Sequence, residues 1–212
     1  VIRILPLLIN PELNYGGDEV FHAREIWEFM QGRNLFFYYE NVNYHGNFEG
    51  YSAIPFVKYF GFYPLPFKLP ALIYYGLFIW SSFLIVRTIN LGASWIVSIF
   101  LVFPPQWLVS WALLHNYVFA PILFLGNMTL YFFIKFKTDN AVRKETVFLL
   151  CFFSGLAIYI FTYSIIYIFT ILFLLALTYP KWDMFRDKIS IKILLQSFVL
   201  LETKKEKVAR IY

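Results

Sequence analysis

The chain has 212 residues, of which 60% are hydrophobic, 23% aromatic and only 15% charged, and its net charge is +5. Soluble domains carry about a quarter charged residues, and the apolar runs after residue 69 are too long for a soluble core. The basic residues fall in short clusters between these runs, which is typical of membrane loops and not of nucleic-acid binding. The composition therefore predicts an all-α, polytopic transmembrane bundle.

The N-terminal third predicts an extracytoplasmic loop. Residues 1–5 are apolar but too short to span a bilayer, so we interpret them as the end of a truncated span. Residues 6–69 then form the loop, with two interfacial amphipathic helices over 18–31 and 51–60, which end at Gly32 and Gly61. In the first helix, one face is predicted to be apolar and the opposite face polar, and Trp27 on the apolar face suits a helix that lies flat in the headgroup region. The apolar face contains Val20, Ala23, Ile26, Trp27 and Met30, and the polar face contains His22, Arg24, Glu25 and Glu28.

The remaining sequence, 70–201, predicts about five spans or partial spans. Apolar runs at 70–86, 93–103 and 117–134 each suit a span, and Pro104-Pro105 break the second run. Residues 146–179 are too long for one untilted span, so two short spans broken near Thr162-Tyr163 are expected. Residues 189–201 form a partial helix, and 202–212 form a charged tail. We interpret the chain as a fragment that lacks the first span and later spans.

The distribution of basic residues predicts the orientation. Arg87 and the clusters at 135–144 and 181–188 alternate with loops that hold almost no basic residues. The positive-inside rule places these three loops in the cytoplasm and residues 6–69 outside it. The predicted location is the plasma membrane of a prokaryote, or the endoplasmic reticulum in a eukaryote.

The best candidate for chemistry is the acidic pair Asp18-Glu19, which follows Gly-Gly and starts the first predicted helix. His22 and Glu25 follow Asp18 at i+4 and i+7, so these three residues share a strip of the helix. A carboxylate beside an imidazole can take a proton from a hydroxyl. The same spacing also suits an Asp18 N-cap with an ordinary surface pair, and Glu19 suits a first-turn acid that favours the helix dipole. Both interpretations stay open.

Two further positions outside this helix are candidates for substrate binding. Glu49 lies between the two predicted helices, as a site residue or as a solvated loop acid. His115, beside Asn116, lies after the proline break on the same side as Asp18, where it faces a shared cavity or caps a helix.

The loop sequence resembles a known family. It is similar to the first outer loop of GT-C glycosyltransferases. The similar residues are Gly17-Asp18-Glu19 with His22 and Arg24, then 44–51 (YHGNFEGY), and then Phe60-Gly61 before a span. The similarity is greatest to the branch that contains protein O-mannosyltransferases. Pro104-Pro105 with Ser110, and Gly155-Leu156-Ala157 before a helix break, resemble the later spans of the family. The resemblance covers most of the chain, and its specific part is the first loop.

The resemblance implies an inverting sugar transfer from a polyprenyl-phosphate donor to an acceptor hydroxyl outside the cytoplasm. Asp18 would be the catalytic base and Glu19 its support. The implied substrate-binding residues are His22, Arg24, Glu49 and His115, and the basic candidates for the donor phosphate are Arg24, Lys58 and Lys68. The family often has a second acid after the third span, and the nearest residues here are His115 and Asn116. Without that acid a divalent metal is not supported, so no cofactor is expected. The fragment alone is expected to be inactive.

Two other classes of protein fit parts of the pattern. A multi-span transporter or flippase would use the broken helix at Pro104-Pro105 as a midplane site. A catalytically inactive membrane relative would keep the loop without the chemistry.

Overall fold

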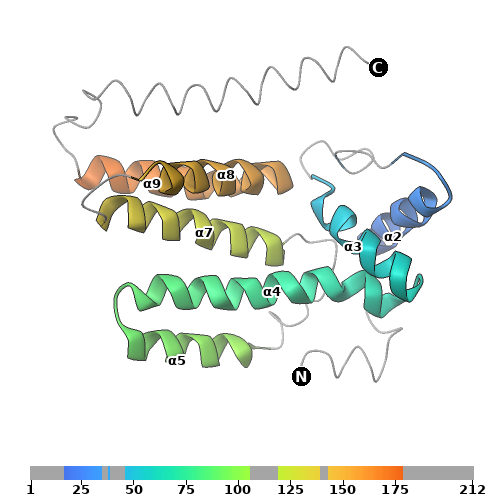
Figure 1. Ribbon diagram of the computed structural model, residues 1–212, viewed down its shortest axis with the longest axis horizontal. Helices are drawn as coiled ribbons and strands as arrows, with labels where there is room; N and C mark the ends of the chain where they lie inside the picture. Colours follow the sequence, from blue (N-terminus) through green and yellow to red (C-terminus); the bar gives the residue numbers. More distant parts are fainter. Residues whose placement is uncertain (1–16, 35–37, 39–45, 106–118, 139–142, 179–212) are drawn as a thin grey trace, which may run out of the picture.

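The structure is a computed structural model that describes residues 17–34, 38, 46–105, 119–138 and 143–178, and every regular element in this part is helical. The elements run from a short helix pair into a set of longer, apolar helices (Figure 1). Their bounds are α2 (Gly17–Met30), α3 (Phe48–Phe60), α4 (Pro64–Arg87), α5 (Leu91–Val102), α7 (Phe119–Thr138), α8 (Lys144–Ile160), the 3₁₀ turn η2 (Thr162–Ser164) and α9 (Ile165–Thr178).

Both helices predicted in the loop are present, and glycines follow both. Gly32 and Gly61 have φ values of 95° and 91°, which L side chains rarely adopt, so these positions stop the helices. Helix α3 starts three residues earlier than predicted, and its first turn therefore includes Glu49. Helix α2 already includes Gly17, so Asp18 lies inside the first turn and is not the N-cap.

Helix α4 forms the centre of the fold. Pro64 begins it, because a first-turn proline loses no helical hydrogen bond and has the right φ. The helix packs against α3, α5 and α7, and α7 in turn packs against α8 and α9. Helix α5 starts at the cap Asn90, whose side chain accepts a hydrogen bond from the Ala93 amide (3.0 Å), and it ends just before Pro104-Pro105.

The long apolar stretch after residue 144 is interrupted where the sequence predicted a break. Helix α8 ends at Ile160 with Phe161 in an extended conformation, and α9 starts at Ile165 after the η2 turn. In Figure 1, α9 returns alongside α8, so the break is a reversal and not a kink.

The ends of the long helices differ in charge. Figure 1 shows α4, α5, α7 and α8 side by side, with α2 and α3 beyond the end where α4 begins. The opposite end holds Arg87 at the end of α4, Lys135 and Lys137 in the last turn of α7, and Lys144 at the start of α8. These are the basic residues from which the orientation was predicted, and the orientation itself stays a prediction.

The surface of these helices is apolar while their contacts include polar groups. Large hydrophobic side chains on α5 and α9 are exposed, among them Trp95, Phe100 and Phe169. Between α4 and α7, the Asn127 amide donates to the hydroxyls of Ser82 (2.8 Å) and Ser81 (3.3 Å). Small polar residues between helices with an apolar exterior also occur in proteins packed in lipid.

Two described helices, α4 and α7, are long and apolar enough to cross a membrane. They have 24 and 20 residues, and their most apolar windows have mean hydropathies of 1.8 and 1.5. Only 22% and 39% of these windows are buried, so neither resembles the buried core helix of a soluble protein. The predictions for residues 1–16, 106–118 and 179–212 lie outside the described residues.

Candidate functional site

Helix α2 turns Glu19 and His22 toward the protein, and Val20 and Trp27 away from it. Glu19 is 0% exposed and His22 is 7% exposed, whereas Val20 and Trp27 are 54% and 47% exposed. Val20 and Trp27, on the predicted apolar face, therefore point away from the protein, whereas Ile26 from the same face is buried. We call Glu19, His22, Glu25 and Ile26 the inner face of α2.

Apolar contacts hold this inner face against α3 and α4. Ile26 packs into a buried cluster with Ala53 and Val57 of α3 and Phe67 of α4. Because side chains at i, i+3 and i+7 share one side of a helix, the docking of Ile26 also turns Glu19 and His22 inward. The position of Asp18 is two turns before Glu25, and its side chain lies outside the described part of the chain.

Glu19 meets a lysine that lies far from it in the sequence. The Nζ atom of Lys68, in the second turn of α4, lies 3.2 Å from Oε2 of Glu19, and both side chains are 0% exposed. Lys68 was a candidate for the donor phosphate, but the structure pairs it with a carboxylate inside the protein. A buried charge is costly unless it is paired in this way.

The other end of the inner face meets the start of α3. Asn47 donates from Nδ2 to Oε2 of Glu25 (3.1 Å), which links residues 22 positions apart. Asn47 is itself buried, and Glu49 is 1% exposed. Of the two interpretations of Glu49, that of a solvated loop acid is therefore wrong. We call Glu19, His22, Glu25, Asn47, Glu49 and Lys68 the inner polar cluster; it contains three carboxylates and one lysine.

The residues before α3 dock on the end of α8. Gly46 donates its amide to the Ile160 carbonyl (3.0 Å), and the rings of Tyr38 and Tyr159 meet edge to face at 5.7 Å. Close by, the hydroxyls of Ser52 and Tyr74 are hydrogen-bonded at 2.7 Å and join α3 to α4. The inner polar cluster thus lies where α2, α3 and α4 meet, beside the α8 end.

Replacing Gly46 by alanine is expected to destabilise this docking. The new Cβ would collide with the Tyr159 backbone oxygen and would lie 2.7 Å from its ring, and a backbone atom cannot move aside easily. Overpacking of this kind costs about 1–3 kcal/mol, which thermal unfolding in detergent would detect. Gly76→Ala is the control, because nothing lies within 4 Å of its Cβ. An equal melting temperature for both variants would contradict the close approach at Gly46.

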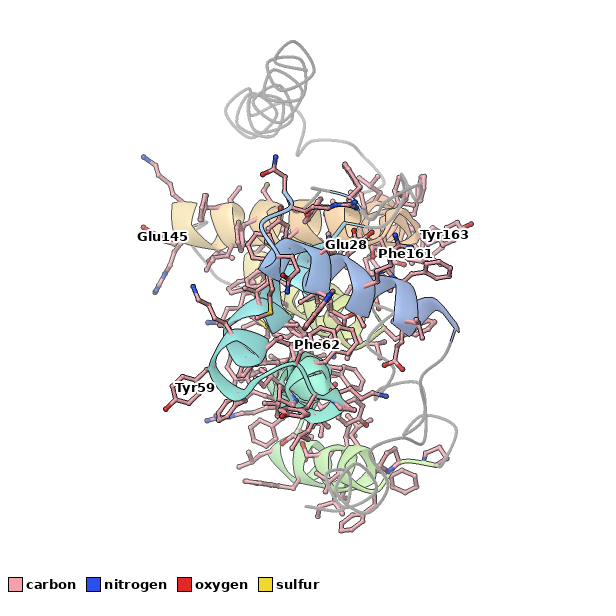
Figure 2. The ribbon with its side chains drawn as sticks, turned by 90° about the vertical axis from the view of Figure 1, so that its right-hand side faces the viewer. Glu28, Tyr59, Phe62, Glu145, Phe161 and Tyr163 are labelled. Carbon is pink, nitrogen blue, oxygen red and sulfur yellow. The ribbon has the colours of Figure 1, made fainter. Side chains whose placement is uncertain are left out.

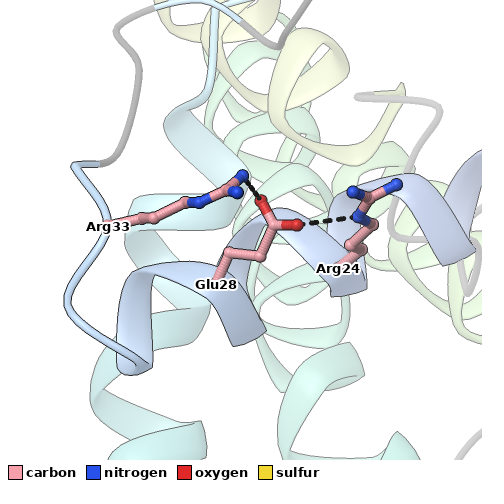
Figure 3. A network of polar contacts seen from close by, with 3 residues as sticks. All are labelled: Arg24, Glu28 and Arg33. Carbon is pink, nitrogen blue, oxygen red and sulfur yellow. Dashed lines mark hydrogen bonds and ion pairs between the residues drawn. The ribbon is translucent and has the colours of Figure 1, made fainter.

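The outer face of α2 carries a small ion-pair network (Figure 3). Glu28 accepts from Nε of Arg24 (2.8 Å) and from Nη1 of Arg33 (2.7 Å). The hydrogen bond from Arg24, with the attraction of Arg33 and against partial desolvation, lowers the pKa of Glu28 below its usual value. Its contribution to stability is present above the ordinary pKa of a glutamate and is lost as the pH falls through the lowered value.

An apolar groove with a volume of about 440 Å³ lies beside this network. It is lined by Val20, Ala23, Arg24, Trp27 and Phe62. Phe62 follows α3, and its ring meets Trp27 edge to face at 5.2 Å. Figure 2 shows Phe62 beside α2, and Tyr59 projecting from α3. The groove therefore combines an apolar surface with one guanidinium.

The predicted site residues separate into two groups. Glu19 and His22 of α2 and Glu49 of α3 are each buried, while Arg24 lies on the outer face of α2. His115 lies outside the described residues. Asn47 and the pairing of Lys68 with Glu19 were not predicted. The signal in the sequence for Lys68 is a lysine in an otherwise apolar, proline-rich segment that begins a predicted span. In the part of the chain that the structure describes, no three His, Cys, Asp or Glu side chains form a metal site.

No protein-family model, curated protein or solved structure matches this chain.

Proposed function

We propose that this chain belongs to a GT-C-like, polytopic membrane glycosyltransferase of the protein O-mannosyltransferase type. It would move a sugar from a polyprenyl-phosphate donor to an acceptor hydroxyl outside the cytoplasm, with inversion. The observation that carries the proposal is the inner polar cluster, in which Glu19 and Glu49 are buried where α2, α3 and α4 meet.

The burial of Glu19 on α2 argues for a use beyond folding. A helix that only rested on the membrane surface would leave its carboxylates in water. Here the apolar residues face outward and the carboxylate is inside, at a desolvation cost of several kcal/mol per ion. Ionisable groups that a membrane protein turns inward commonly mark a functional site.

The proposed chemistry is a direct displacement at the anomeric carbon, and it needs one base. Asp18 would remove the proton of the acceptor hydroxyl while the hydroxyl oxygen attacks the anomeric carbon of the sugar. The new C–O bond forms as the bond to the polyprenyl phosphate breaks, and the phosphate leaves with the electron pair. Direct displacement inverts the anomeric carbon. Glu19 would support Asp18, and His22 and Glu49 would contact substrate.

The groove on α2 supports a lipid-linked donor. Of the three basic candidates for the donor phosphate, Lys68 is paired with Glu19 inside the protein, whereas Lys58 and Arg24 are exposed and Arg24 is paired with Glu28 at the surface. Arg24 also borders an apolar groove that suits an isoprenoid chain. The exposed aromatic residues Trp27, Tyr59 and Tyr63 suit the headgroup region of a bilayer, where the groove would open.

The test uses the full-length protein in membranes and a panel of polyprenyl-phosphate sugars. Membranes with the natural chain are expected to transfer at least one sugar, and membranes with an equal amount of Asp18→Asn are expected to transfer none above background. If both chains transfer equally, Asp18 has no catalytic role. If neither transfers a sugar from any donor, the protein is better explained as a transporter or an inactive relative.

A further inference from the structure

The ion pair between Glu19 and Lys68 ties together elements that are 49 residues apart. Of the ion pairs in the described part of the chain, it is the one in which both side chains are 0% exposed. Glu19 lies in the first turn of α2, next to Asp18, and Lys68 lies in the second turn of α4. The contact therefore fixes the acidic pair to the point where α4 begins.

The start of α4 is a rigid support for the lysine. Pro64, Pro66 and Pro70 flank Lys68, and each proline fixes its own φ near −65°. The long lysine side chain is thus presented from a backbone with little freedom. A second contact, from Asn47 to Glu25, holds the same face of α2 two turns further on.

Such a pair is a poor choice for stability alone. The attraction between two buried charges offsets their desolvation cost only when the geometry is good. Proteins in which such a pair is replaced by apolar side chains of similar size are often as stable or more stable. Its value lies in a fixed geometry, because neither charge can leave its partner without being stranded in the interior.

We infer that Lys68 is a positioning residue, which holds Glu19 and with it the first turn of α2, including Asp18, against the start of α4. The docking part is independent of any activity, and the consequence for transfer rests on the proposed function. This role differs from that of a phosphate ligand, which would act on donor binding.

A cysteine-labelling experiment tests the docking. Ala53 is buried beneath Ile26 of α2, and the only cysteine of the chain is Cys151. In full-length protein carrying Cys151→Ala and Ala53→Cys, the new thiol is expected to react slowly with a membrane-impermeant maleimide. Adding Lys68→Met is expected to speed labelling at least about tenfold, because α2 opens locally more often. Lys68→Arg should restore slow labelling.

Lys58→Met provides the matched control, since this lysine is exposed on α3 and should leave the labelling rate unchanged. If Lys68→Met does not accumulate in the membrane, Glu19→Gln breaks the same pair and is expected to label as fast. Labelling that stays slow in both variants would overturn the inference.

Transfer kinetics of Lys68→Met without the labelling mutations separate positioning from phosphate binding. Lys68→Met is expected to lower kcat at least about tenfold, with KM for the donor changed less than about twofold. A raised KM with unchanged kcat would assign Lys68 to the phosphate and overturn the inference. Fast labelling together with no transfer by the natural chain would keep the docking and reject the proposed function.

Discussion

Among the acids of α2, Asp18→Asn and Glu19→Gln are expected to lose at least about 100-fold in sugar transfer, and Glu28→Gln less than about twofold. The three changes remove one charge each and keep the size of the side chain. Glu28 follows Glu19 by nine positions, which is two and a half turns, so it lies on the opposite side of the helix. Its partners are Arg24 and Arg33, outside the inner polar cluster.

The measurement is the rate of transfer at saturating donor in membranes with equal amounts of each chain. Glu28→Gln serves as the control for a general effect of charge on α2, since it breaks an ion-pair network without touching the inner face. A loss in all three variants would mean that transfer needs the net charge of α2. A loss in Glu28→Gln alone would place the site on the outer face, beside Arg24.

Most helices of the described region follow from local signals in the sequence. The break after α8 was predictable because an apolar run of more than thirty residues exceeds one span, and Thr162-Tyr163 interrupts it. Gly32 and Gly61 mark the ends of α2 and α3, and Pro104-Pro105 marks the end of α5. The multi-span arrangement and its orientation stay predictions, with two helices that meet the length and hydropathy of a span.

The face that α2 buries did not follow from periodicity. The period groups Val20, Ile26 and Trp27 on one face, but Ile26 is buried in the protein while Val20 and Trp27 are exposed. Beside a membrane, an apolar stripe can face lipid and leave the polar stripe to pack inside. The decisive contacts are Ile26 with Val57 and Phe67, which depend on the positions of α3 and α4 and are not visible in the sequence of α2.

The site was predictable in part for a similar reason. Glu19, His22 and Glu49 were selected because acids and a histidine gather in a loop before a span. Asn47 and Lys68 act through contacts across 22 and 49 residues, and spacing along one helix cannot reveal such partners. A cluster of this kind needs the tertiary structure to join its members.

Replacing both members of the buried ion pair should separate stability from activity. Lys68→Met alone strands the Glu19 carboxylate in the interior, and breaking a buried pair in this way costs about 3–5 kcal/mol. Glu19→Met together with Lys68→Met removes both charges and fills the space with side chains of similar size. The double variant is expected to recover the stability of the natural chain or to exceed it by about 1–4 kcal/mol.

The same double variant is expected to transfer no sugar above background, because the carboxylate beside Asp18 is gone. Thermal unfolding in detergent and transfer from the polyprenyl-phosphate donor, measured on one preparation, give both results. A double variant as unstable as Lys68→Met would show that the ion pair itself stabilises the fold. A stable double variant with natural activity would remove Glu19 from the chemistry and leave Asp18 to act without it.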